Sequence, residues 1–170
     1  MRLRNRSIPP RNVVATGEEQ RVEEDSASVF DDEPLKEKLV SCITEIYQAL
    51  GTGRRESVYV KALQVKLSRS NIDSLAEYPV PLMFESKKVG CAYLDLLVPN
   101  KYFFEVKANA KVSIRDVLQT RAYSRETMLA GFLVNFPQQT GNDVNPEIFL
   151  LEGNLNSETL SRTSHSLVIQ

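Results

Sequence analysis

The sequence contains few of the residues that build disulfide frameworks or histidine-rich metal centres. Its two cysteines, Cys42 and Cys91, form neither a metal-binding pattern nor a disulfide framework. We therefore expect both to be small buried thiols in a reducing compartment. The single histidine, His165, lies in a C-terminal stretch rich in Ser, Asn and Thr, and we assign it no role.

Long apolar runs are absent as well. No segment offers the roughly 20 consecutive apolar residues that cross a bilayer, and no secretory signal with a hydrophobic centre is present. Internal repeats and low-complexity tracts are also lacking. We therefore expect an intracellular protein without a membrane partner, and an organelle or the nucleus is a compatible location.

Acidic and basic residues are segregated near the start of the chain. Residues 1–17 contain four arginines and no acid, whereas residues 18–33 contain eight acids and one arginine. The remainder has an excess of about two positive charges, which is compatible with nucleic-acid binding without demanding it. The arginine-rich start is compatible with a transit peptide or a nucleic-acid-binding arm, and a solvated tail is the default interpretation.

Composition also indicates the domain organisation. Residues 1–33 have few large apolar side chains, so ordering them would bury little surface to offset the loss of entropy. At 170 residues the chain has room for one domain with tails. We expect a disordered head at 1–33, one folded domain at 34–152 and a frayed tail at 153–170.

Two helices are predicted before the first strand. Pro34 suits a first helical turn, and apolar residues then recur at helical spacing up to Leu50. After a break at residues 51–53, a second helix is expected from about Arg54 to Arg69. Glu56 lies at the margin of its apolar face, and taken alone it reads as a surface carboxylate favoured by the helix dipole.

Strands dominate the remainder of the chain. Pro79 and Pro81 restrict the first strand to a sheet edge or a bulge. Ser113 and Asp116 form a capping-box pattern that opens a third helix, which runs to about Thr127. The expected strands cover residues 71–84, 89–98, 101–108, 129–136 and 146–151, with a polar turn at 85–88. This order predicts an α/β domain with a mixed sheet and helices on its faces.

Three charged residues fall on two largely apolar strands that a tight turn at Pro99-Asn100 joins. Asp95 precedes the turn, and Glu105 and Lys107 follow it. Because strand side chains alternate between faces, Glu105 and Lys107 project the same way. Charges on an otherwise buried strand are costly unless they are paired or bind a metal. A buried ion-pair network and a metal site are therefore the two interpretations.

The spacing of these residues resembles the PD-(D/E)xK nucleases, which assemble a metal site from Asp, then nine residues, then Glu-x-Lys. The stretch GRRESVY at residues 53–59 resembles the motif of the GxxExxY family, a branch of that superfamily. Further matches follow in the same order over residues 35–136, among them YPVPL at 78–82 and GFLVNF at 131–136. The resemblance implies a restriction-endonuclease-like core.

The resemblance also implies roles at a metal centre. Asp95 and Glu105 would bind Mg²⁺ or Mn²⁺, with the Val106 carbonyl as a further ligand, since hard oxygen ligands suit these ions. Lys107 would orient the attacking water or stabilise charge on the phosphate. Glu56 would help to hold the metal or its water.

Four residues of the third predicted helix are candidates for substrate positioning. Gln119 and Tyr123 match a helix that lines the site in this family, and their spacing of four puts them on one face. Arg115 and Arg121 supply positive charge nearby. Phosphate contact and a solvated helix face explain these arginines equally well.

Three functions are compatible with this sequence. The first is a metal-dependent nuclease that hydrolyses phosphodiester bonds, with DNA favoured over RNA. The second is a catalytically silent nucleic-acid-binding or scaffold subunit that keeps the nuclease fold, and the third is a structural domain with a buried ion-pair network. A homodimer or a place in a larger assembly is compatible with the first two.

Overall fold

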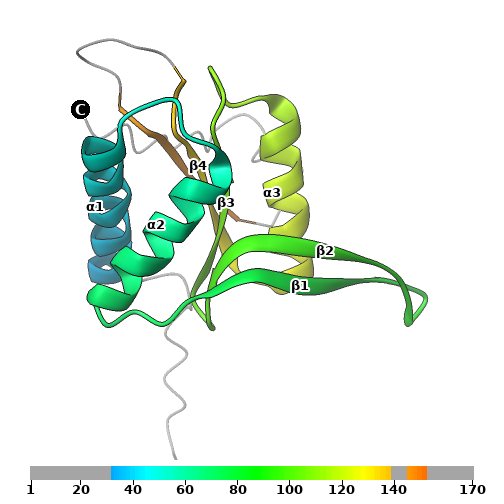
Figure 1. Ribbon diagram of the computed structural model, residues 1–170. Helices are drawn as coiled ribbons and strands as arrows, with labels where there is room; N and C mark the ends of the chain where they lie inside the picture. Colours follow the sequence, from blue (N-terminus) through cyan, green and yellow to red (C-terminus); the bar gives the residue numbers. More distant parts are fainter. Residues whose placement is uncertain (1–31, 139–144, 153–170) are drawn as a thin grey trace, which may run out of the picture.

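The fold is a mixed β-sheet with helices on both faces. The computed structural model describes residues 32–138 and 145–152, in which three helices and five strands follow one another (Figure 1). The helices are α1 (Glu33–Leu50), α2 (Glu56–Arg69) and α3 (Ile114–Thr127). The strands are β1 (Leu75–Phe84), β2 (Lys87–Val98), β3 (Tyr102–Lys107), β4 (Ala130–Asn135) and β5 (Glu147–Leu151).

The strands lie in the sheet in chain order, β1-β2-β3-β4-β5. β3 and β4 are parallel and are connected through α3, whereas the other neighbouring pairs are antiparallel. The mixed α/β sheet expected from the sequence is therefore confirmed. β1 is an edge strand, as Pro79 and Pro81 predicted, because proline cannot donate to a second neighbour.

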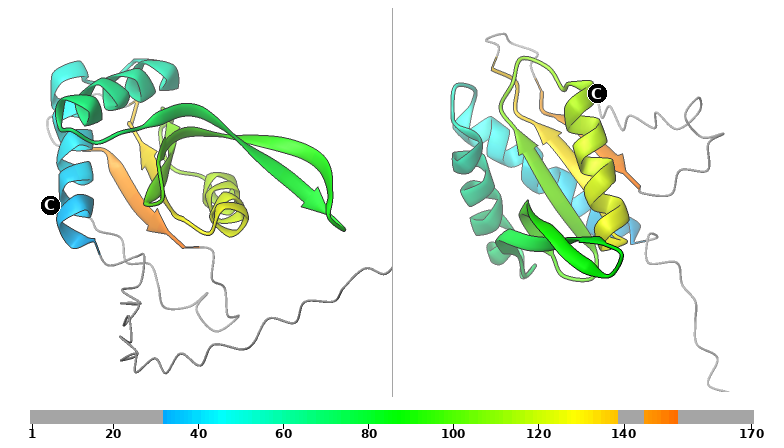
Figure 2. Two further views of the ribbon diagram at one scale, coloured as in Figure 1. Left: turned by 90° about the horizontal axis from the view of Figure 1, so that it is seen from below. Right: turned by 90° about the vertical axis from the view of Figure 1, so that its right-hand side faces the viewer.

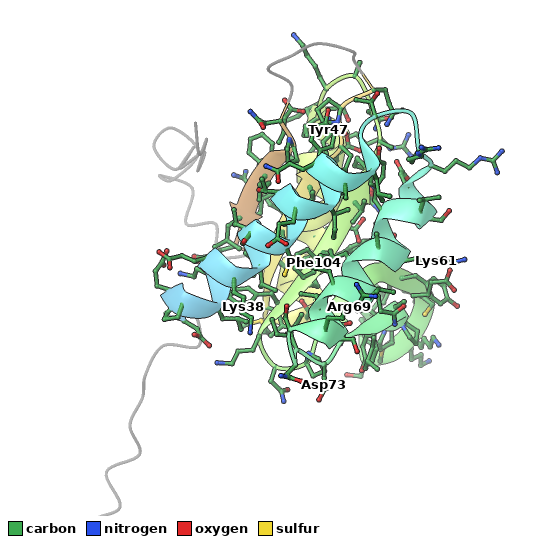
Figure 3. All side chains as sticks on the ribbon, turned by 60° about the vertical axis from the view of Figure 1, so that its left-hand side comes forward. Lys38, Tyr47, Lys61, Arg69, Asp73 and Phe104 are labelled. Carbon is green, nitrogen blue, oxygen red and sulfur yellow. The ribbon has the colours of Figure 1, made fainter. Side chains whose placement is uncertain are left out.

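The sheet separates two apolar clusters. α1 and α2 cover one face and α3 covers the other (Figures 1 and 2). Phe104 of β3 packs beneath α1 and α2 in the larger cluster (Figure 3), and Phe103 of the same strand packs in the smaller cluster on the side of α3. The alternation of side chains along β3 therefore serves both layers.

The third helix starts where the sequence predicted. The Ser113 hydroxyl accepts a hydrogen bond from the Asp116 N–H, and the Asp116 carboxylate accepts one from the Ser113 N–H. β4 is buried at every position, as expected for a strand covered on both faces. Gly131 of β4 is required by packing, because a Cβ at this position would overlap the ring of Phe103.

The structure differs from the expectations in several local details, and β1 begins at Leu75 rather than at residue 71. The turn between β1 and β2 has two residues, Glu85 and Ser86, both with positive φ, rather than the four expected at 85–88. α2 begins at Glu56, so the two residues before it belong to a loop. Cys42 is buried as expected, but Cys91 is only partly buried on the β1–β2 hairpin.

Some expectations concern residues outside the described ranges. These are the tail at 153–170, which contains His165, and the head at 1–33 except for its last two residues. Asp32 and Glu33 are described: Asp32 forms an ion pair with Lys101 (2.9 Å), and Glu33 begins α1. Within residues 32–138 and 145–152, no helix combines the length and apolar character needed to cross a bilayer.

Candidate active site

Strands β2 and β3 separate at Asp95. Their paired residues run from Val98 opposite Tyr102 to Leu96 opposite Phe104 and stop there. Beyond that point the Val106 N–H donates to the Asp95 carboxylate, with a distance of 2.7 Å from N to Oδ2. The Asp95 carboxylate thus accepts the hydrogen bond that a main-chain carbonyl of β2 would accept if the two strands stayed paired.

The Val106 carbonyl lies on the same side of β3 as its N–H. Both groups of one strand residue point toward the same neighbouring strand, which here is the diverging β2. The separation therefore places a main-chain oxygen next to a carboxylate. The buried face of β2 also changes at this position, because Leu94 belongs to the cluster beneath α3 and Leu96 to the cluster beneath α1 and α2.

Glu105 is the most deeply buried acid of the site. Glu105 is only 2% exposed, and its Oε2 atom lies 3.4 Å from the Nζ atom of Lys107. Its other oxygen, Oε1, is buried and has no hydrogen-bond partner in the part of the chain that the structure describes. Burial and the charge of Asp95 raise the pKa of Glu105 to about 8, despite the opposing effect of Lys107.

Lys107 remains charged although its side chain is only 14% exposed. Burial lowers the pKa of its ammonium group, but the surrounding carboxylates outweigh burial and the net shift is upward. The largest of these effects come from Glu105 and Asp95, and Glu56 adds to them. One cation therefore faces several acids, and the cluster holds excess negative charge.

Glu56 joins this cluster from helix α2, whereas the other three residues lie on strands of the sheet. It is the first residue of α2, and its Oε1 accepts a hydrogen bond from the Ala108 N–H at 3.3 Å, directly after the end of β3. Burial raises the pKa of Asp95, and the charge of Glu56 adds to this effect. The structure therefore brings together Glu56, Asp95, Glu105 and Lys107.

The predicted positioning residues lie on α3. Gln119 donates to the Tyr123 hydroxyl at 3.0 Å, and Tyr123 packs against the smaller apolar cluster. Among the described residues, no hydrogen bond joins this pair to Asp95, Glu105 or Lys107. Of the two arginines predicted to position the substrate, Arg115 is exposed and Arg121 is half-buried, and neither forms an ion pair within the described ranges.

Glu77 was not predicted as a site residue. It lies on β1 between Ala76 and Tyr78, which pair with the two neighbours of Asp95, and it has a φ of 50°. Its negative charge contributes to the raised pKa of Asp95, after the larger effect of burial. The sequence contains no signal for this placement, because a register shift between Leu82 and Met83 decides which β1 residue faces Asp95.

The oxygen atoms of the site fit a small divalent cation. In the described ranges, no three His, Cys, Asp or Glu side chains are grouped as a ready metal cage. The protein ligands on offer are the carboxylates of Asp95 and Glu105 with the Val106 carbonyl. Mg²⁺ commonly binds through one or two carboxylates and keeps several waters. The unpartnered Oε1 of Glu105 is a buried acceptor that such an ion would satisfy.

The mixed sheet and the acid–lysine cluster define the class of protein as an α/β fold of the restriction-endonuclease type. A family model described as the PD-(D/E)XK nuclease superfamily matches residues 33–146, which is more than half of the chain. The chain therefore belongs to the PD-(D/E)XK nuclease superfamily. No curated protein and no solved structure matches it significantly.

Proposed function

We propose that the chain is a metal-dependent nuclease of the GxxExxY branch, acting on DNA in preference to RNA. The three residues that define this motif each have a structural role. Gly53 has a φ of 79°, Glu56 holds the Ala108 amide, and Tyr59 is fully buried. The Tyr59 hydroxyl donates to the Gly51 carbonyl at 2.6 Å, and its ring stacks on Phe136 with centroids 4.0 Å apart. The motif therefore fixes the loop that presents Glu56 to the end of β3.

The observation that carries this proposal is the state of Glu105. A structural ion pair would satisfy both oxygens of a buried carboxylate, because an unmet acceptor costs about 1–3 kcal/mol. Here Lys107 satisfies one oxygen at 3.4 Å, and the other faces no donor among the described residues. A further cation at this oxygen would remove the cost. The ion-pair interpretation leaves the oxygen unexplained.

In the proposed reaction each residue has a separate task. Asp95 and Glu105 hold Mg²⁺ or Mn²⁺, with the Val106 carbonyl as a third protein ligand and Glu56 as a holder of the ion or of its water. A divalent cation bound by these residues would act as a Lewis acid, which would make a bound water a better nucleophile and would neutralise charge on the phosphate. Lys107, charged and held by Glu105, orients the attacking water or stabilises the negative charge that develops on the phosphate.

The residues of α3 are proposed to act on the substrate rather than on the ion. The hydrogen bond between Gln119 and Tyr123 holds both polar groups in one orientation, which suits positioning of a sugar or base. Arg115 and Arg121 form no ion pair with a carboxylate of the described ranges, and their guanidinium groups suit contact with phosphates. A homodimer or a larger assembly would extend this surface, and its existence is part of the proposal.

The test is a cleavage assay on linear, circular and single-stranded DNA and on RNA of the same sequence. Each substrate is incubated with Mg²⁺, Mn²⁺ or EDTA. The proposal expects cleavage of DNA with either ion and none with EDTA. Cleavage of circular DNA would identify an endonuclease. Ion-dependent binding of DNA without cleavage of any substrate would instead identify the silent subunit.

A further inference from the structure

An open recess of about 580 Å³ lies beside the candidate active site. It is formed where the loop before α2 meets the end of β3. Residues on its wall include Gly53, Arg54, Arg55, Glu56, Ala108 and Gln138. Two of these belong to or adjoin the site: Glu56 is one of its acids, and Ala108 directly follows Lys107. The recess therefore adjoins the site of the proposed reaction through Glu56 and Ala108.

The main-chain carbonyls of the two recess arginines accept hydrogen bonds, whereas their side chains form no ion pair with the described residues. Gln138 Nε2 donates to the Arg54 carbonyl at 3.5 Å, and the Val58 N–H donates to the Arg55 carbonyl at 2.9 Å. Both arginines are exposed, and neither forms an ion pair with any described carboxylate. The nearby Glu56 uses one oxygen to bind the Ala108 amide instead. Two guanidinium groups are thus available to an anionic ligand.

We infer that this recess binds a phosphate of the substrate strand that neighbours the one being cleaved. The inference rests on the proposed function. Guanidinium groups bind phosphate oxygens through paired, charge-assisted hydrogen bonds, so two adjacent arginines suit one phosphodiester group. The recess is lined by Glu56 and by Ala108, the residue after Lys107, so a phosphate held there would lie next to the one at the proposed site.

The test measures binding of a labelled single-stranded oligonucleotide by fluorescence anisotropy, with EDTA present to prevent cleavage. The double variant Arg54→Ala/Arg55→Ala is compared with the unaltered chain over a range of salt concentrations. Each lost phosphate contact lowers the magnitude of the log–log salt slope by about 0.7 for a single strand. We expect this decrease together with an affinity loss of roughly tenfold. The variant Arg54→Lys/Arg55→Lys, which keeps the charge, should recover the salt slope.

The matched control removes two positive charges from α2, the helix that follows the two recess arginines. Lys61 and Arg69 are exposed on α2 (Figure 3), and Arg69 ends the helix at its far end from Glu56. Lys61→Ala/Arg69→Ala should leave the salt slope unchanged. Thermal melts of every variant establish that the fold is retained.

The possible failures are distinguishable. If the unaltered chain cleaves DNA but Arg54→Ala/Arg55→Ala binds the oligonucleotide as well as the control Lys61→Ala/Arg69→Ala does, the recess is not a phosphate site and the proposed function stands. If the unaltered chain neither binds nor cleaves nucleic acid, both the inference and the proposed function are wrong. Recovery of the salt slope by Arg54→Lys/Arg55→Lys together with an unchanged control supports the recess as the site.

Discussion

Asp95 accepts a hydrogen bond from the main-chain N–H of Val106 at the point where β2 leaves β3. One carboxylate thereby has two tasks. It completes the hydrogen bonding of the sheet, and it presents its charge to Glu105 across the gap. Substitutions of Asp95 must therefore separate a structural effect from an electrostatic one.

Asp95→Asn and Asp95→Ala separate these two effects. Both should abolish Mn²⁺ binding and cleavage, because the negatively charged oxygen ligand is lost. Asp95→Asn keeps an acceptor for Val106 and removes a charge that repels Glu105, so the ion-free protein should be at least as stable as the parent. Asp95→Ala leaves the N–H unpaired and should lose about 1–3 kcal/mol relative to Asp95→Asn. Thermal melts and calorimetric Mn²⁺ titration check both expectations, and equal stability of the two variants would contradict the role of the hydrogen bond.

The raised pKa of Glu105 predicts a particular pH dependence of stability. Because the pKa of about 8 in the folded state exceeds its ordinary value of 4.5, the folded protein binds more protons than the unfolded chain between these limits. Stability in EDTA should therefore fall as pH rises through this window, by at most about 1.4 kcal/mol per pH unit from this group. Denaturant unfolding at several pH values measures the slope.

Two comparisons identify the source of that slope. The glutamine in Glu105→Gln cannot ionise, so this variant should lose most of the decrease in stability with pH. A smaller decrease should remain from Asp95, whose pKa is also raised. Added Mn²⁺ should oppose the fall, because the ion binds the ionised carboxylates. Stability that rises with pH in EDTA would show that Glu105 is not protonated in the folded protein.

Lys107→Met distinguishes catalysis from structural pairing. The variant keeps both carboxylates and most of the apolar stem, so Mn²⁺ binding should persist while cleavage falls by orders of magnitude. In a purely structural ion pair, the same change leaves Glu105 buried without its partner and should cost roughly 3–5 kcal/mol. Lys61→Met, at an exposed position on α2, is the control. Metal binding is measured by calorimetry, stability by thermal melts and activity by the cleavage assay. A large loss of stability in Lys107→Met, together with no metal binding by the parent, would contradict the nuclease assignment.

Gly131→Ala tests the packing of the sheet against α3. A methyl group at this position would overlap the fully buried ring of Phe103, which must then shift within a dense core. We expect a loss of about 1–3 kcal/mol in the free energy of unfolding. Gly90→Ala is the matched control, because its Cβ would meet Leu82 at 3.4 Å, an ordinary contact. Similar stability of both variants by denaturant unfolding would contradict this close approach.

The elements that depend on neighbours in sequence were predictable. The helical spacing of α1, the capping box of Ser113 and Asp116, and the edge position set by Pro79 and Pro81 all appear as expected. The helix and its cap depend on interactions between residues a few positions apart. The edge position depends on the N–H group that proline lacks. The same-face placement of Glu105 and Lys107 was predictable for the same reason, because two residues of one strand share a face wherever the strand lies.

The properties that turn these residues into a site depended on distant parts of the chain. The sequence by itself determined the types and spacing of Asp95, Glu105 and Lys107, and it carried the superfamily pattern that the family match bears out. Only the tertiary structure decided that β2 leaves β3 at Asp95, that one oxygen of Glu105 is buried without a partner, and that α2 delivers Glu56 to Ala108. Strand separation, burial and helix docking arise from packing between segments far apart in sequence, and local patterns contain no information on these distances.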